Sequence, residues 1–180
     1  MFHGQILPDD LCIAAGAARF ALGDAASVPG LLTGSEAGLR VQGGFWWAHL
    51  LPRAVRTSLA AGDSALATRL AASLEPPLQP LAEHATVAAR ALLSEARGDY
   101  DVAAAGFADA AARWHDFAAV YEEAHALLGQ GRCLLALDRA PEAAPVLEQA
   151  REIFAKLKAK PALDETEALL AQTGSGQAAP

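Results

Sequence analysis

A recurring turn signal constrains the fold of this chain more than any other feature. A small residue, or leucine in one case, precedes an aspartate at the start of several helical patterns: Gly23-Asp24, Gly62-Asp63, Gly98-Asp99 and Leu137-Asp138. The aspartates are 39, 36 and 39 residues apart, which is close to the period of proteins built from helix-turn-helix repeats. The spacing therefore predicts a series of repeated helix pairs.

The clearest pair occupies residues 81–117. Apolar residues recur there at intervals of three and four, as on one face of a helix that runs from about Leu81 to Ala96. Gly98 ends this helix, and Asp99 is placed to cap the next one. Because each helix has one apolar face, the two are expected to pack against each other.

The same signals divide the rest of the chain. We expect an N-terminal helix and a glycine-rich loop in 1–44, a degenerate pair in 45–75, a second complete pair in 118–160, a capping helix in 161–172 and a disordered tail in 173–180. Pro141 suits the first turn of a helix, and Pro145 is tolerable only at or next to that turn. Pro161 is expected to interrupt the chain before the capping helix.

Composition favours an all-α fold. Alanine, the best helix former, supplies 45 of the 180 residues. Only 6% of the residues are aromatic, and β-branched residues are scarce, so a β-sandwich or barrel would lack the side chains that fill a pleated surface. The cysteines, Cys12 and Cys133, are too few and too far apart for a zinc knuckle or a disulfide framework, and they are interpreted as small buried residues.

The charges argue against several partners. The chain has 14 basic and 21 acidic residues and a net charge of -7, so a nucleic-acid partner is not expected. The three lysines, Lys156, Lys158 and Lys160, lie in one stretch, but acidic neighbours dilute their field, and the preferred interpretation is a solvated helix end. Without a basic secretory start or an apolar run of spanning length, the protein is expected to be cytoplasmic, with no membrane partner.

The helix pair in 81–117 resembles a tetratricopeptide repeat. The residues concerned are Ala91, Gly98-Asp99-Tyr100-Asp101, Ala103, Phe107 and Ala110. In that family small residues lie where paired helices touch, and an aromatic side chain packs between neighbours. The pair in 118–160 matches less fully, with Leu147 at the aromatic position. The resemblance implies an all-α, right-handed α-solenoid of tetratricopeptide-like helix pairs with a C-terminal capping helix.

A narrower resemblance involves residues 126–132, 141–144 and 150–154. They are similar to the C-terminal repeat region of bacterial LuxR-type ATP-binding regulators and of adenylate or guanylate cyclase proteins that contain an AAA-like ATPase. This implies a non-catalytic regulatory scaffold in signal transduction, with a protein or peptide partner such as an upstream ATPase or cyclase domain of the same polypeptide. No Walker-type loop is present, so neither an enzyme nor a cofactor is expected in this chain.

The tetratricopeptide pattern also indicates a groove formed by the first helix of each pair. Its open positions, which are our candidates for partner binding, are His49, Arg56, Leu92, Glu95, His125, Leu128 and Arg132. The set mixes apolar and charged side chains, which suits an extended peptide or a helix. A face that is merely solvated is the alternative.

A small helical metal-binding or enzymatic bundle is the alternative function. Glu122 and His125 have the glutamate-x-x-histidine spacing of di-iron bundles, but the second copy that such a site needs is absent. His125 is therefore interpreted as solvent-facing. Gly129-Gln130-Gly131 lies within a helical pattern and follows no strand, so it indicates close helix packing rather than nucleotide binding. The aromatic pair Trp46-Trp47 is interpreted as core packing at a helix start.

Overall fold

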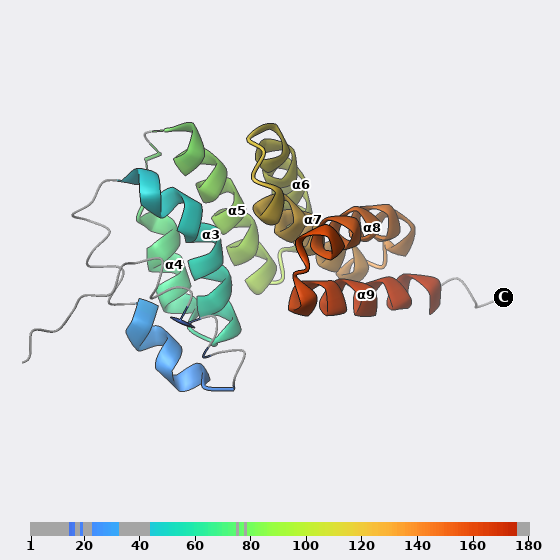
Figure 1. The fold of residues 1–180 in the computed structure, drawn as a ribbon, viewed down its shortest axis with the longest axis horizontal. Helices are drawn as coiled ribbons and strands as arrows, with labels where there is room; N and C mark the ends of the chain where they lie inside the picture. The colour runs from blue at the N-terminus through green and yellow to red at the C-terminus, as the bar shows by residue number, and fades with distance from the viewer. Residues whose placement is uncertain are drawn as a thin grey trace, which may run out of the picture. The chain divides into compact units, whose positions relative to one another are not determined.

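The computed structural model describes residues 15, 16, 19, 23–32, 44–74, 76, 77 and 79–175, except the side chains of residues 25, 44–47 and 175. All regular secondary structure in these ranges is helical, so the described protein is all-α, as expected (Figure 1). The elements are η1 (Ala25–Ser27), α3 (Gly44–Ala60), α4 (Ser64–Ala72), α5 (Pro80–Ala96), α6 (Tyr100–Asp116), α7 (Val120–Ala136), α8 (Ala140–Leu157) and α9 (Lys160–Ser175). None of the described helices has both the length and the apolar character needed to cross a membrane.

From α5 onward the helices begin at a constant interval. Their first residues are Pro80, Tyr100, Val120, Ala140 and Lys160, so each helix with its turn takes 20 residues and a helix pair takes 40. The turns share a residue with positive φ, namely Gly98 (82°), Ala118 (58°), Asp138 (58°) and Lys158 (55°). A left-handed residue at this position ends a helix and reverses the chain. The pair is longer than the roughly 34 residues of a standard tetratricopeptide repeat.

The turn motif is displaced by one residue in its last copy. Gly98 has positive φ and Asp99 follows it at the N-cap of α6. In the last copy Asp138 itself has positive φ and Arg139 is at the N-cap of α8. The equivalent of Gly98 is therefore Asp138 and not Leu137. Aspartate enters the left-handed region more readily than most residues with a side chain, so it can replace glycine there.

The aspartates of this motif differ in what their side chains do. Asp63 caps α4, because its Oδ1 accepts a hydrogen bond from the Leu66 N–H at 2.8 Å. Asp99 makes no capping bond. Its Oδ2 accepts instead from Arg97 Nε at 3.2 Å. The predicted side-chain cap at Asp99 is therefore wrong, although the residue does stand at the N-cap.

Three boundaries differ from those predicted. Pro161 lies in the first turn of α9 rather than interrupting the chain, since proline fits that turn. The helix ends at Ser175, so residues 173–175 of the expected tail are helical. Residues 28–32, expected in a loop, are also helical. The expectation that Pro145 lies at or next to the unbonded first turn is wrong: it is the sixth residue of α8, where an amide would otherwise bond the carbonyl of Pro141.

Some predictions lie outside the described residues. They concern most of the N-terminal helix expected at 11–22, the loop at 33–43, the tail beyond residue 175, Cys12 and the aromatic side chains of residues 45–47.

The chain divides into two units, Met1–Ala89 and Arg90–Pro180, with the boundary inside α5. In the first unit α3 and α4 pack together and bury Leu51, Val55, Leu66 and Leu70. Gly16 faces the same core, since a Cβ placed there would lie 3.7 Å from Leu32 Cγ and 3.9 Å from Thr57 Cγ2.

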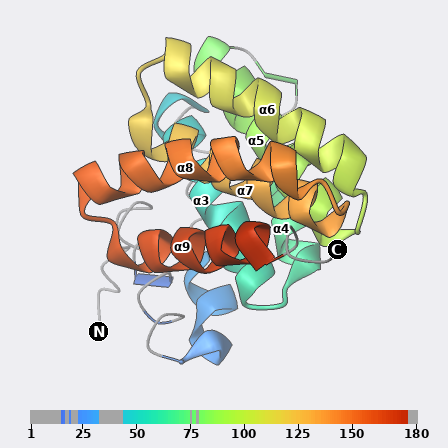
Figure 2. The same ribbon diagram turned by 90° about the vertical axis from the view of Figure 1, so that its right-hand side faces the viewer.

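In the second unit α6, α7, α8 and α9 are successive antiparallel neighbours, and α7 also contacts α9. Figure 2 shows the α6–α7 and α8–α9 turns on one side of this unit, at the left, and the α7–α8 turn on the other. The core repeats with the helices: buried Phe107 and Trp114 of α6 correspond to buried Leu147 and Phe154 of α8, 40 residues later. Equivalent positions of α6 and α8 therefore fill the space on both sides of α7.

Candidate functional site

Two glycines allow α6 and α8 to approach α7 closely. A Cβ at Gly129 would lie 2.6 to 2.8 Å from three ring atoms of Phe107, and one at Gly131 would lie 2.5 Å from Leu147 Cγ. Real Cβ contacts are not this short, so only glycine fits here without a rearrangement. The prediction that Gly129-Gln130-Gly131 is a packing motif is confirmed.

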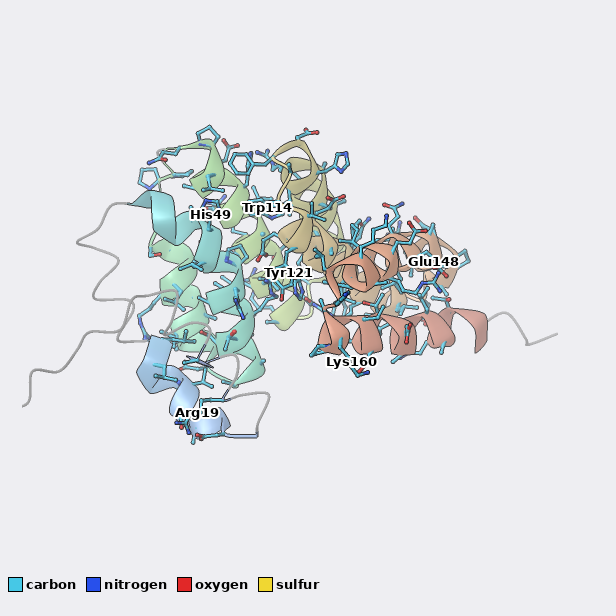
Figure 3. The ribbon with its side chains drawn as sticks, in the orientation of Figure 1. Arg19, His49, Trp114, Tyr121, Glu148 and Lys160 are labelled. Atoms are coloured by element: carbon cyan, nitrogen blue, oxygen red, sulfur yellow. The ribbon has the colours of Figure 1, made fainter. Side chains whose placement is uncertain are left out.

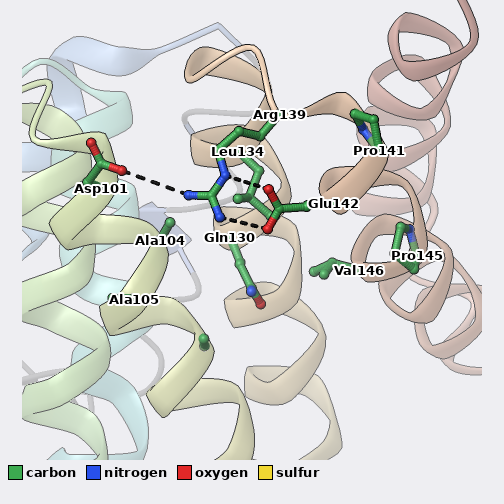
Figure 4. A pocket seen from close by; sticks show the side chains of 11 residues that line it. Asp101, Ala104, Ala105, Gln130, Leu134, Arg139, Pro141, Glu142, Pro145 and Val146 are labelled. Atoms are coloured by element: carbon green, nitrogen blue, oxygen red, sulfur yellow. Dashed lines mark hydrogen bonds and ion pairs between the residues drawn. The ribbon is translucent and has the colours of Figure 1, made fainter. Parts of the chain in front are cut away.

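A groove of about 520 Å³ lies between α6 and α8, above α7 (Figure 4). We call it the α6–α8 groove; its lining residues are Asp101, Ala104, Ala105 and Ala108 of α6, Gln130 and Leu134 of α7, and Arg139, Pro141, Glu142, Pro145 and Val146 at and after the start of α8. The space is open because the alanines are short and the proline rings are compact. Pro145 also lacks the amide that would otherwise bond the carbonyl of Pro141, which faces the same groove.

One guanidinium dominates the mouth of the α6–α8 groove. Arg139 Nε and Nη2 donate to the two carboxylate oxygens of Glu142, each at 2.7 Å. Its Nη1 lies 3.8 Å from Asp101 Oδ1 on α6. These hydrogen bonds raise the pKa of Arg139 and lower the pKa of Glu142. One guanidinium therefore serves two carboxylates, the closer of which is that of Glu142.

A second guanidinium connects three helices. Arg132 of α7 donates through Nε and Nη2 to Glu95 of α5 at 2.7 and 2.9 Å, and through Nη1 to Glu165 of α9 at 2.9 Å. Burial opposes the charge on Arg132, but the hydrogen bonds and the charge of Glu95 outweigh it, so the pKa of Arg132 is raised. Two of the predicted groove residues, Glu95 and Arg132, are thus paired with each other inside the chain.

The other predicted groove residues are placed differently from one another. Leu92 and Leu128 are only 5% and 1% exposed, so the expectation that they stand at open positions is wrong. Both belong to the apolar stripe of a helix, and that stripe is withdrawn from water by packing. His49 is exposed and Arg56 half-buried on α3, in the first unit. The five candidates of the second unit therefore do not form one open surface, because two are buried and two are paired with each other.

His125 is half-buried rather than solvent-facing. Its ring lies 4.6 Å from that of Tyr121 and 5.0 Å from that of Phe154, centre to centre, in edge-on arrangements. It therefore helps to join the start of α7 to the end of α8. Its predicted role in partner binding is not tested by these contacts.

The residues considered for metal or nucleophilic chemistry are not grouped into a site. Within the described ranges no three histidine, cysteine or acidic residues lie close enough to hold a metal ion. Glu123, adjacent to the glutamate-x-x-histidine step, pairs with His115 Nδ1 at 3.0 Å. Cys133 is buried, and burial raises its pKa to about 12. A thiol that stays protonated is a poor nucleophile and a poor metal ligand.

The α6–α8 groove was not predicted from the sequence. Its residues come from three helices, and its charged mouth uses Arg139, which belongs to none of the sites predicted from the sequence. A usable signal is the combination of short side chains at Ala104, Ala105 and Ala108 with the proline-rich start of the second helix in the following pair. Comparison of the chain with protein-family models, curated proteins and solved structures finds no match in any of the three.

Proposed function

We propose that this chain is a non-catalytic protein-interaction module that acts as a regulatory scaffold. In this proposal its tetratricopeptide-like pairs stack into a right-handed α-solenoid, and α9 caps the last pair. The 20-residue interval supports stacking, as does the contact of α7 with α6, α8 and α9, because solenoids are built from contacts between near neighbours. The resemblance to the repeat regions of bacterial LuxR-type and ATPase-cyclase proteins supports a cytoplasmic signalling role.

The α6–α8 groove is the observation that carries the proposal. Its volume of about 520 Å³ is sufficient for one or more side chains of a bound peptide. Leu134 and Val146 offer apolar contact, and the amide of Gln130 offers one donor and one acceptor to a peptide backbone.

The chemistry of the groove lining favours binding over catalysis. Its titratable residues are those at the mouth, where Arg139 is hydrogen-bonded to Glu142 and lies 3.8 Å from Asp101. The remaining lining residues are alanine, proline, leucine, valine and glutamine, none of which can act as an acid, a base or a nucleophile. An occupant is therefore held by shape and by apolar contact.

The test is a comparison of two arginine substitutions at exposed alanines of the second unit. Ala105→Arg places a long side chain in the groove, whereas Ala96→Arg lies at the end of α5, outside it. Arginine is a good helix former, so both variants should keep their helicity in circular dichroism. We expect a partner purified with the chain from its source cells to bind the wild type and Ala96→Arg directly, and to be lost with Ala105→Arg. Equal binding to both variants would refute the groove as the site, and the absence of any direct partner would refute the scaffold role.

A further inference from the structure

The polar groups that line the α6–α8 groove are mainly hydrogen-bond acceptors. The ionised carboxylates of Asp101 and Glu142 can only accept, and the side chain of Asp101 is 80% exposed, so a ligand can reach it. Among the lining residues only Arg139 and Gln130 have side chains that donate, and the guanidinium of Arg139 is already held by Glu142 (Figure 4). A ligand that donates hydrogen bonds therefore suits the groove better than one that accepts them.

The charges at the mouth of the groove add up to a negative sum. Arg139 supplies one positive charge, and Asp101 and Glu142 supply two negative charges. Asp138, next to Arg139 in the chain, is exposed and takes part in no ion pair among the described residues. The helix dipoles cancel one another here, because the starts of α6 and α8 lie beside the ends of α5 and α7. Three carboxylates therefore accompany one guanidinium at this end of the groove.

The arginines of the neighbouring segments are paired or face away from the groove. Arg132 lies two residues from both Gln130 and Leu134, and residues two apart on a helix are about 200° apart around its axis. Its guanidinium is thus on the opposite side of α7, where it serves Glu95 and Glu165. Three other arginines each pair with a carboxylate: Arg97 with Asp99, Arg113 with Asp109 and Arg151 with Glu148.

Arg90 belongs to α5, which lies behind α6 as seen from the groove. A Cβ at Gly106 of α6 would lie 3.1 Å from the Cβ of Ala91, so Gly106 faces α5. Ala104 and Ala108, which line the groove, are each two residues from Gly106 and therefore point the other way. The positive charge of Arg90 is separated from the groove by the body of α6.

The lysines are too far away to offset the carboxylates at the mouth. Lys156 follows Glu142 by 14 residues, which is about 21 Å along α8 and well beyond the Debye length of about 8 Å. Lys158 and Lys160 come later still, and Figure 3 labels Lys160 at the start of α9, past this end of α8. Within the described residues of the second unit, no cation therefore cancels the negative charge at the mouth.

The length of the groove sets the spacing of the groups that can fill it. Asp101 and Ala105 are one helical turn apart on α6, about 6 Å along its axis. In an extended peptide, side chains two residues apart point to the same side and are about 6.6 Å apart. One side chain of such a peptide can thus reach Asp101 while the second next one enters the apolar part of the groove beside Ala105.

We propose that the α6–α8 groove binds an extended basic segment of a partner protein, in which a lysine or arginine lies two residues from an apolar side chain. The base donates hydrogen bonds to Asp101, and the apolar side chain packs between Ala105, Leu134 and Val146. The inference rests on the proposed interaction function and specifies a partner class. The net charge of -7 on the whole chain attracts the same partner and repels nucleic acids and anionic membranes.

The experiment selects peptides from a displayed library of random short sequences against the full chain. Selected peptides are synthesised, and their dissociation constants are measured by fluorescence anisotropy. The test variant is Asp101→Asn/Glu142→Gln. The control is Asp116→Asn/Glu152→Gln, which makes the same change in net charge at exposed positions of the same two helices; these positions lie about 22 Å and 15 Å farther along α6 and α8. We expect the selected peptides to have the proposed spacing, and to bind the test variant about tenfold more weakly while binding the control as they bind the wild type.

A second set of peptides tests where the base binds. Each selected peptide is synthesised again with its lysine or arginine replaced by glutamine. If the base meets the mouth of the groove, this replacement should weaken binding to the wild type about tenfold but have little effect on binding to the test variant. Ala105→Gln, which fills the groove without adding a charge, should weaken every peptide.

Three results would overturn the inference. Additive effects of the peptide and protein changes would show that the base binds elsewhere, although a loss of affinity with Ala105→Gln would still leave the groove as the interaction site. Selection of no peptide, or of peptides without a base, would exclude the basic segment, while the partner test with Ala105→Arg decides the proposed function separately. Spermidine that binds as tightly as the peptides and displaces them would replace the partner protein by a small organic cation.

Discussion

Replacing Gly131 with alanine tests whether close packing, rather than flexibility, explains the glycine. The new methyl group would lie 2.5 Å from Leu147 Cγ. This atom is the branch point of a side chain that is 0% exposed, so it has little room to move. Overpacking of this kind costs about 1 to 3 kcal/mol, while alanine in place of a helical glycine gains about 0.5 to 1 kcal/mol. We therefore expect a net loss of about 1 to 2 kcal/mol in the free energy of unfolding.

A double-mutant cycle separates the clash from any other effect of the substitution. Leu147→Ala alone should cost about 2 to 5 kcal/mol, because it leaves a cavity. Leu147→Ala removes the three atoms that lie nearest to the methyl of Gly131→Ala, so in that background the substitution should become stabilising by about 0.5 to 1 kcal/mol through helix propensity. The coupling energy from urea denaturation, followed by circular dichroism, should then be about 1 to 3 kcal/mol.

Gly174→Ala is the matched control. Gly174 lies in α9, and no described atom lies within 4 Å of a Cβ placed there. It should leave stability unchanged or raise it by up to about 1 kcal/mol. The reasoning is refuted if Gly131→Ala has the same cost with and without Leu147, or if it is no more harmful than Gly174→Ala.

Four further outcomes follow from the described contacts. Asp63→Ala should lower the free energy of unfolding by about 1 kcal/mol because it removes a side-chain cap, whereas Asp99→Ala should change it by much less. Urea denaturation of both variants measures the difference. Equal losses would contradict the assignment of the cap to Asp63 alone. Arg132→Met should lower the free energy of unfolding by about 2 kcal/mol in the same assay, because it leaves the partly buried carboxylate of Glu95 without its partner. Arg132→Lys keeps a positive charge and should cost less. A greater loss with lysine than with methionine would show that the charge of Arg132 is unimportant. The pKa of Cys133 is raised from 9.0 to about 12, so the folded state holds this proton more tightly than the unfolded state. The resulting stabilisation should be fully present below about pH 9, and the free energy of unfolding should fall above pH 9 by up to about 1.4 kcal/mol per pH unit. Cys133→Ser should remove that slope in denaturation curves measured across this pH range. The full chain purified without chelator should hold less than about a tenth of an equivalent of iron, manganese or zinc by elemental analysis, and a stoichiometric metal would favour the helical metal-binding bundle.

The helices from residue 80 onward could be predicted because their cores repeat at helical spacing. The paired helices at 81–117 and 118–160 correspond to α5 with α6 and α7 with α8, and the glycines of α7 were correctly attributed to packing. The position of the turn between α7 and α8 was harder to predict from the sequence. Leucine followed by aspartate looks like glycine followed by aspartate, and only the backbone shows that Asp138 takes the left-handed position.

The candidate groove residues show where sequence reasoning ends. The pairing of Arg132 with Glu95 and Glu165 joins residues 37 and 33 positions apart, and it depends on how successive helices are placed side by side. The burial of Leu128 depends on neighbours on more than one side of α7. A single-helix pattern indicates an apolar face but not how much of that face other helices will cover.

The 20-residue interval has a consequence for how such a chain can change its length. Duplication of residues 100–139 would insert one helix pair with its two turns. The segment begins at a helix start and ends at the residue before the next helix start, so both new junctions would repeat a backbone conformation that the chain already has. Two helix contacts would be new: a second Phe107 would face Gly131 where Leu147 now lies, and α7 would contact its own copy in the way that it now contacts α9. A gain of 40 residues would therefore require adjustment only where the new pair meets the existing helices, whereas a gain that is not a multiple of 20 residues would interrupt the interval at which the left-handed turns recur.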